Sequence, residues 1–286
     1  MKRHPTALKI ILACFLALAG IAVLSYPTIA SYLYQRNATR VVSSYAKNIA
    51  SLDPNMVAAQ LKRAHNYNDD LAGNPVHDPF IYGSGMALDK DYLSILDVGG
   101  IMGSVEIPKI SVNLPIYHGT SSDTLSKGVG HLEGTSLPVG GLRTHAVLTG
   151  HTGLSYARMF TDLTELKKGD MFYIHVLGKT LAYQVDQIKI VWPQNTKDLS
   201  LFPDHDYVTL LTCTPYGIND HRLLVRGTRV PYDPKVKARI ARSKGLSYEQ
   251  KLALITGSAT AAVMLIIGVP TYRLLNRRRL WRKASY

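Results

Sequence analysis

Cys213 is the side chain in this 286-residue sequence best placed for covalent chemistry. It lies where an apolar run meets a Pro-Gly turn (LLTCTPYG, residues 210–217). A residue at the end of a strand faces a rim of the fold, where other groups can reach a thiol. We therefore interpret Cys213 as a candidate nucleophile, and a packing role as a small apolar side chain is the alternative.

Arg222 lies nine residues after this cysteine and begins the next predicted strand (HRLLVRG, residues 221–227). A strand, a turn and a returning strand place the end of one beside the start of the other, so Cys213 and Arg222 can face one site. There a guanidinium would favour a thiolate and would donate hydrogen bonds to a developing oxyanion. The alternative is an arginine on a strand surface, as we expect for Arg226.

His151 ends an apolar strand and lies between glycines (AVLTGHTG, residues 146–153). Acyl transfer at a cysteine needs an acid for the leaving amine and a base for the incoming nucleophile, and imidazole serves both near neutral pH. The chain has 10 histidines, so residue type alone does not select one. His131, His145 and His221 are rivals by placement. We interpret His145 as a strand-face and His221 as a turn-side structural residue.

The elements that must position these residues are mainly β. Many short strands with two brief helices, near residues 121–127 and 158–167, indicate a closed or nearly closed barrel. The longest strand changes phase after Val185, as a β-bulge would produce. The candidate strands are residues 104–110, 112–117, 145–149, 171–177, 180–190, 207–213 and 222–230.

A helical region is expected before the barrel. Apolar residues recur at helical spacing over residues 31–70, and Asp53 followed by Pro54 is typical of an N-cap and first helical position. Residues 74–80 (NPVHDPF) then favour a loop over a helix or a central strand.

The formal charge of +13 is concentrated at the ends of the chain. Nine of the 33 Lys and Arg residues lie in residues 1–9 and 273–286, where there is no acid. Each basic end borders an uncharged apolar run, residues 10–26 and 252–272, long enough to cross a membrane. The basic ends therefore suit anionic membrane lipid, and no folded basic stripe with aromatics supports a nucleic-acid role.

The basic N-terminus favours a cytoplasmic start, which places residues 27–251 outside the cell. Six cations between residues 235 and 251 weaken this assignment, and a cleaved signal peptide is an alternative for the first run. We expect a two-span protein of the cell membrane with these parts: cytoplasmic start 1–9, span 10–26, helical region 27–75, loop 76–86, catalytic barrel 87–232, basic connector 233–251, span 252–272 and cytoplasmic tail 273–286.

Two cysteines occur, and Cys14 falls in the first span. Cys213 is then the sole thiol of the outer domain, which excludes an intrachain disulfide and a cysteine-based metal site there. We expect no cofactor.

Taken together, these motifs resemble those of class C sortases, the pilus-assembling class. The resemblance spans about residues 35–275 and includes GVGHLEGTSLP (128–138), THAVLTGH (144–151), LLTCTPYG (210–217) and HRLLVRG (221–227). It implies an eight-stranded sortase barrel, with Cys213 as nucleophile, His151 as general acid and base, and Arg222 as stabiliser of substrate and oxyanion.

The resemblance also implies the substrate. An LPxTG-like sorting signal would be cut between Thr and Gly to give a thioester, which a lysine amine of the next pilin subunit resolves as an isopeptide bond. The catalytic domain would be monomeric and would act on a Gram-positive-type cell surface.

A lid is implied too, because class C members carry a loop with an Asp, a Pro and an aromatic residue, as at Asp78-Pro79-Phe80. Asp78 would pair with Arg222, and Phe80 would cover Cys213. We expect an exposed ion pair of about 0–1 kcal/mol and an aromatic contact of about 1–2 kcal/mol, so that substrate can open the lid. The alternative is that Asp-Pro only starts a turn.

Two rival functions are alternatives to the sortase interpretation. A papain-like hydrolase would need Cys213 and His151 with an Asn or Asp that orients the imidazole, but would not require Arg222. A membrane-anchored adhesin or assembly scaffold would need none of them. Replacement of Cys213 by Ala separates the scaffold from either enzyme, and an amine acceptor separates transfer from hydrolysis.

Overall fold

The computed structural model describes residues 5–71, 76–80, 88–243, 246 and 248–283. The chain forms two compact units, one from residues 1–32 with 246–286 and the other from Leu33–Gly245. The second unit contains every strand and all the predicted site residues.

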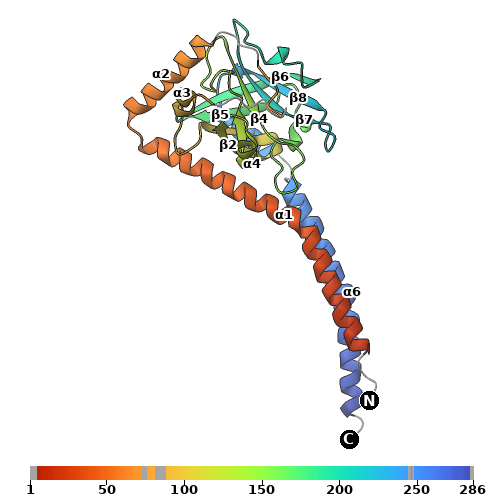
Figure 1. Cartoon of the computed structure of the whole chain (residues 1–286). Helices are drawn as coiled ribbons and strands as arrows, with labels where there is room; N and C mark the ends of the chain where they lie inside the picture. Colours follow the sequence, from red (N-terminus) through yellow and green to blue (C-terminus); the bar gives the residue numbers. More distant parts are fainter. Residues whose placement is uncertain (1–4, 72–75, 81–87, 244–245, 247, 284–286) are drawn as a thin grey trace. The chain divides into compact units, whose positions relative to one another are not determined.

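Eight strands close into a barrel in the order β1-β2-β3-β4-β7-β8-β6-β5 (Figure 1). Neighbouring strands are antiparallel except for the parallel pairs β2–β3 and β4–β7. This confirms the mainly β, eight-stranded architecture. The strands are β1 Gly103–Ile107, β2 Val112–His118, β3 Val129–His131, β4 Thr144–Thr149, β5 Met171–Val176, β6 Lys179–Val191, β7 Asp206–Thr214 and β8 His221–Val230.

Two local features differ from the expected strands. β3 was not predicted, because it has only three residues and a central glycine, too few for an alternating pattern. The expected extension of β1 to residue 110 is instead a 3-10 turn that starts at Pro108, a residue with no N–H for a strand ladder. The expected bulge is present, since the β6–β8 register shifts between Val185 and Gln187.

Alternate residues of β4, β7 and β8 pack into two separate apolar clusters. Leu148, Leu210 and Val225 belong to the main core. Val147, Leu211 and Leu224 point to the other face of the same strands and join Leu132 and Leu199. We call this second group of five residues the outer cluster, and Val76, Phe80 and Val191 pack against it.

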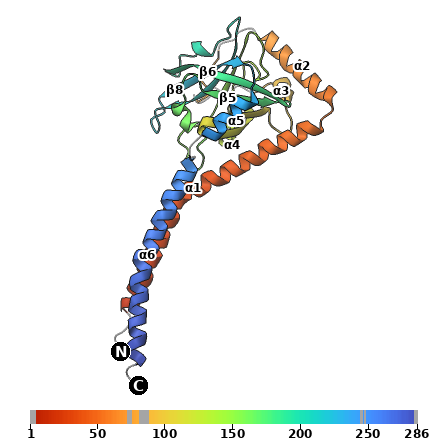
Figure 2. The same ribbon diagram turned by 180° about the vertical axis from the view of Figure 1, so that it is seen from behind.

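Helices flank the barrel of the second unit (Figures 1 and 2). The Asp53 carboxylate accepts from the Asn55 N–H (2.8 Å) and caps α2, which confirms the predicted start of this helix. Asn68 of α2 exchanges two hydrogen bonds with the backbone of Leu137 (2.7 and 3.1 Å). The helices are α1 Pro5–Ser51, α2 Pro54–Asp70, α3 Lys90–Ser94, α4 Ser122–Lys127, α5 Pro234–Ser243 and α6 Tyr248–Lys283, with 3-10 turns η1 Pro108–Ile110, η2 Thr161–Glu165 and η3 Lys197–Leu199.

The N-terminal helix is long and apolar enough to cross a membrane. The qualifying stretch is Phe15–Ser51, so an N-terminal apolar helix is present as expected. Within the described part of α6, the apolar stretch Gln250–Ile266 falls short of the length for a span. The second span expected at residues 252–272 is therefore not shown.

Candidate active site

Cys213 and Arg222 lie directly opposite each other on neighbouring strands. β7 and β8 pair antiparallel, and the register joins Cys213 to Arg222 and Thr214 to His221. The thiol is free and half-buried, while the Arg222 side chain is buried. The strand-turn-strand argument therefore places both residues correctly at one end of the barrel.

His151 reaches the same end through the parallel pair of β4 and β7. Their last register pair is Thr149 with Leu211, and the Gly150 N–H donates to the Leu211 carbonyl (3.1 Å). The Thr212 hydroxyl donates to the Gly150 carbonyl (2.7 Å) and extends this alignment by one residue. His151 follows Gly150, just beyond the end of β4, and Cys213 follows Thr212 in β7.

Glycine is required at position 150 for close packing. A Cβ atom there would lie 2.7 Å from Cδ2 of the Phe160 ring, closer than real Cβ contacts. The Phe160 N–H also donates to the His151 carbonyl (3.1 Å). Phe160 therefore fixes the backbone that carries the imidazole.

Asp78 holds the Arg222 guanidinium with two hydrogen bonds. Nε donates to Oδ2 (2.6 Å) and Nη2 donates to Oδ1 (3.0 Å). The Arg222 and Asp78 side chains are only 7% and 2% exposed, so the expected exposed ion pair is wrong and the pair is buried. The pair is buried because residues 76–80 fold onto the strand ends. Nη1 also donates to the carbonyls of Asn219 and His221, both at 3.1 Å.

Phe80 packs over the same site. Its N–H donates to Asp78 Oδ1 (2.9 Å) in a local turn, so both the turn and the ion pair are present. The centroid of its ring lies 5.5 Å from that of His151 and 5.2 Å from Arg222 Cζ. Of the predicted lid, residues 76–86, the last six lie outside the described residues.

Burial shifts the pKa values of the candidate thiol and imidazole in opposite directions. It raises the pKa of the Cys213 thiol, Arg222 opposes this rise, and Asp78 adds to it. Burial also lowers the pKa of His151. Both shifts favour a neutral thiol and a neutral imidazole in this site.

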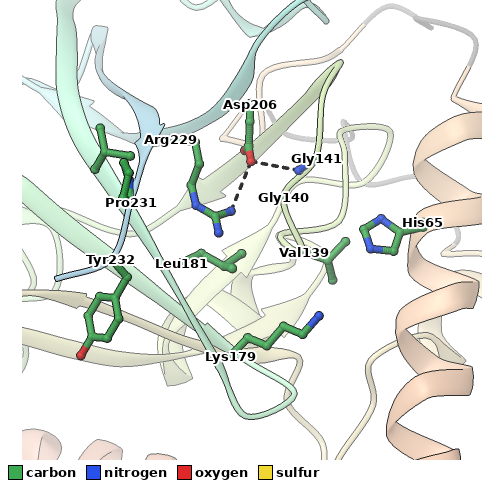
Figure 3. A pocket seen from close by; sticks show the side chains of 11 residues that line it. His65, Val139, Gly140, Gly141, Lys179, Leu181, Asp206, Arg229, Pro231 and Tyr232 are labelled. Carbon is green, nitrogen blue, oxygen red and sulfur yellow. Dashed lines mark hydrogen bonds and ion pairs between the residues drawn. The ribbon is translucent and has the colours of Figure 1, made fainter. Parts of the chain in front are cut away.

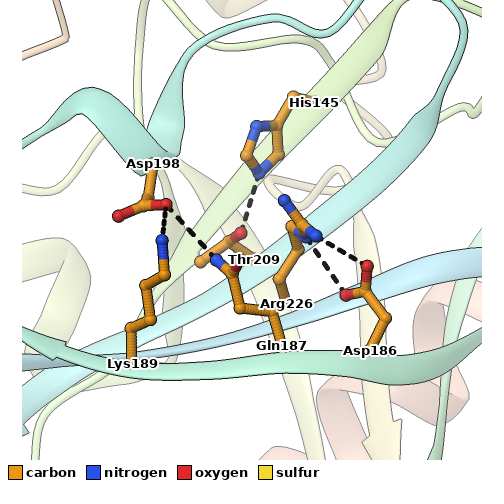
Figure 4. A network of polar contacts seen from close by, with 7 residues as sticks. All are labelled: His145, Asp186, Gln187, Lys189, Asp198, Thr209 and Arg226. Atoms are coloured by element: carbon orange, nitrogen blue, oxygen red, sulfur yellow. Dashed lines mark hydrogen bonds and ion pairs between the residues drawn. The ribbon is translucent and has the colours of Figure 1, made fainter.

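The rival histidines serve the fold. His145 Nδ1 donates to the Ser200 carbonyl (2.8 Å), and Nε2 accepts from the Thr209 hydroxyl (2.7 Å), within the polar network of Figure 4. His131 contacts the Tyr92 hydroxyl and the Ser136 carbonyl, both at 2.9 Å. Burial lowers the pKa of each of these two imidazoles to about 4. The His221 ring packs against Trp192 at a tilt of 34°, with ring centroids 4.0 Å apart.

A hollow of about 560 Å³ lies at the opposite ends of β7 and β8 (Figure 3). None of the five predicted site residues lines it. Its carboxylate, Asp206, accepts from the Gly141 N–H (2.9 Å), the Tyr183 hydroxyl (2.8 Å) and Arg229 Nη1 (3.2 Å). This carboxylate is thus satisfied within the fold and ties the strand ends together.

Sequence reasoning missed the groups that support the three candidates. The carbonyl of Asn219, the hydroxyl of Thr212 and the ring of Phe160 act through contacts that no spacing rule encodes. Only the contact with Phe160 leaves a trace in the sequence, as the glycine at position 150, which on sequence alone indicates a backbone turn and not a close neighbour.

A thiol, an imidazole and a guanidinium at one end of a closed β-barrel define a site suited to acyl transfer at cysteine. The sortase domain model matches residues 105–230. The crystal structure of sortase C-1 from Streptococcus pneumoniae is 52% identical, with a TM-score of 0.64 over 68% of this chain and 100% of that chain. Sortase C-1 from Actinomyces oris is also 52% identical, with a TM-score of 0.59 over 62% of this chain and 99% of that one.

Curated relatives of the chain are also sortases. Sortase D of Bacillus subtilis is 33% identical over 137 residues, which are 47% of this chain and 66% of that protein. Across the first relatives of this kind, the chain covers between 47% and 66% of their length. The chain belongs to the sortase family of cysteine transpeptidases. Its solved neighbours, at 43–52% identity, are class C sortases, and this chain is of that class.

Proposed function

We propose that this sortase joins pilin subunits into a covalent surface pilus, with Cys213 as nucleophile, His151 as general acid and base, and Arg222 as the stabiliser of the oxyanion. A solved neighbour of 46% identity is described as a pilus-related sortase C of group B Streptococcus. The observation that carries the assignment is the direct pairing of Cys213 with Arg222, whose guanidinium is held by a buried carboxylate of the lid.

The reaction begins when a substrate displaces the Asp78 carboxylate. The guanidinium then exchanges the Asp78 carboxylate for the oxyanion that develops on the threonine carbonyl of an LPxTG-like signal. Cys213 Sγ forms a bond to that carbonyl carbon, and the thiol proton passes to His151. Collapse of the tetrahedral intermediate breaks the Thr–Gly bond, and His151 returns the proton to the leaving amine.

The thioester is resolved by an amine. The acceptor lysine of the next pilin attacks the thioester carbon while His151 takes its proton, and the carbon–sulfur bond breaks to leave an isopeptide bond. The overall reaction breaks one amide bond and forms another, so no external energy source is needed. If water attacks instead, the enzyme acts as a thiol peptidase.

The remaining assignments are part of the same proposal. Residues 10–26 and 252–272 would cross the cell membrane, and the barrel at 87–232 would face the wall. Residues 27–75 and 233–251 would connect it to the two spans, and residues 1–9 and 273–286 would be cytoplasmic. Support comes from the apolar N-terminal helix and from the basic residues that border both apolar runs. The catalytic domain would act as a monomer without a cofactor.

The test is a polymerisation assay with the full-length chain in detergent and a candidate pilin. We expect a ladder of covalent multimers on a denaturing gel, and none with Cys213→Ala, His151→Ala or Arg222→Ala. Arg226→Ala is the matched control, because it removes an arginine of the same strand that pairs with Asp186 instead of Asp78. Ladders from the Cys213→Ala enzyme would refute the proposal, and cleaved monomers alone would favour a hydrolase.

A further inference from the structure

Thr149 carries a buried hydroxyl without a partner. The residue is 0% exposed, and its Oγ1 has no hydrogen-bond partner among the described residues. Buried polar groups are nearly always paired, and an orphaned one destabilises the fold, so this exception needs an explanation.

The position of Thr149 relates the hydroxyl to the lid. Thr149 is the last residue of β4, and strand alternation puts its side chain on the face of Val147. Its register partner on β7 is Leu211. Both Val147 and Leu211 belong to the outer cluster, on which Phe80 packs.

The lid also contacts the residue on the other side of Thr149. The Phe80 ring lies against His151, two positions further along the chain. Thr149 therefore lies in sequence between Val147, a member of the outer cluster against which Phe80 packs, and His151, whose ring Phe80 contacts. Strand alternation puts the Thr149 side chain on the face of that cluster.

This surface becomes available when the lid leaves. The outer cluster is an apolar floor, which suits the leucine and proline of an LPxTG-like signal. Those residues precede the scissile bond, and His151 marks where the bond must lie. Thr149, about 7 Å before His151 along an extended strand, then faces the peptide just upstream of that bond.

We propose that Thr149 is a substrate-binding residue, whose hydroxyl donates a hydrogen bond to a backbone carbonyl of the sorting signal just before the scissile bond. The inference rests on the proposed function and adds a residue to it. An extended peptide presents backbone carbonyls that need donors once they leave water. The resting enzyme keeps the matching donor unpaired, so substrate and hydroxyl satisfy each other.

The test compares Thr149→Val, which keeps the shape and removes the hydroxyl, with Thr149→Ser, which keeps the hydroxyl. Both are made in the full-length chain and assayed with a fluorogenic LPxTG peptide, with the acyl-enzyme followed by mass spectrometry. We expect Thr149→Val to lower kcat/KM by about 10- to 100-fold, mainly through KM, and Thr149→Ser to restore most of it. The melting temperature of Thr149→Val should equal or exceed that of the wild type, because a buried orphan hydroxyl is gone.

Ser104→Ala is the matched control. Ser104 on β1 also carries a buried hydroxyl without a partner, and β1 pairs with β2 and β5, not with β4 or β7. This variant should hold its melting temperature and its kcat/KM. Labelling of Cys213 by a small alkylating reagent should be unchanged in all three variants, which shows that the thiol is intact.

Two results would overturn the inference. One is a Thr149→Val enzyme with wild-type kcat/KM. The other is a Thr149→Val enzyme that melts several degrees lower, while Thr149→Ser restores both the melting temperature and kcat/KM. That pattern would indicate a structural role for the hydroxyl. If the wild type itself forms no acyl-enzyme with the peptide, the proposed function fails as well, so the two failures are distinguishable.

Discussion

Removal of the Asp78 carboxylate should open the site. Asp78→Ala deletes two hydrogen bonds to Arg222 and the local bond to the Phe80 N–H. Loss of one partner of a buried ion pair costs about 3–5 kcal/mol, because the other charge is left without compensation. The carbonyls of Asn219 and His221 still hold Nη1, so we take the lower end, about 3 kcal/mol.

This free energy bears on the equilibrium between closed and open lid. About 3 kcal/mol corresponds to roughly a 100-fold change in the ratio of the two states. A reagent that reaches Cys213 only in the open state should therefore label the thiol up to about 100-fold faster in Asp78→Ala.

The assay is the rate of modification by a methanethiosulfonate reagent as a function of pH, in a Cys14→Ser background. The pH profile separates two effects. Burial and, to a lesser extent, Asp78 both raise the pKa of Cys213, so loss of the carboxylate and opening of the lid both shift the profile to lower pH. Only lid opening also raises the plateau at high pH, where every thiol is ionised.

Asp186→Ala is the matched control, since it breaks a two-bond pair with Arg226 on the same strand and leaves the lid untouched. The reasoning is refuted if the Asp78→Ala plateau equals that of the wild type, or if Asp186→Ala raises it equally.

Two further predictions concern stability. Burial lowers the pKa of both His131 and His145 from 6.5 to about 4, so the unfolded state takes up protons first as the pH falls. Stability should be constant above about pH 6.5 and should fall toward pH 4, by about 2 kcal/mol per histidine at pH 5, and urea unfolding of His145→Gln should show a flatter pH dependence. Gly150→Ala should lose about 1–3 kcal/mol and most peptide cleavage, because the new Cβ collides with the Phe160 ring. Phe160→Leu should partly rescue it, and no rescue in paired melting curves would contradict this mechanism.

The sequence predicts the parts of the fold that depend on local pattern. Strand alternation and Gly-Pro turns mark most of the barrel, and the ends of β4, β7 and β8 mark the three candidate residues. Their meeting at one end follows from the β7–β8 turn for Arg222. For His151 it depends on a parallel pair between strands distant in sequence, which no local pattern encodes.

Contacts between distant segments account for what the sequence does not show. Asp78 and Arg222 are 144 positions apart, so their pairing was implied only by family resemblance and its burial was not expected. The orphan hydroxyl of Thr149 is equally hidden, because a threonine in a Thr-Gly-His motif looks the same whether or not its hydroxyl is paired.

The parallel ladder between β4 and β7 has a consequence for the newly made chain. Paired residues of β4 and β7 are about 62 positions apart in sequence. The ladder therefore forms only after the segment between them, which includes the β5–β6 hairpin, has been looped out so that the two strands can meet. Until that late step, the sulfur has no imidazole beside it, although the β7–β8 hairpin alone can already bring Arg222 opposite Cys213. Assembly of the complete candidate site is thus coupled to completion of folding.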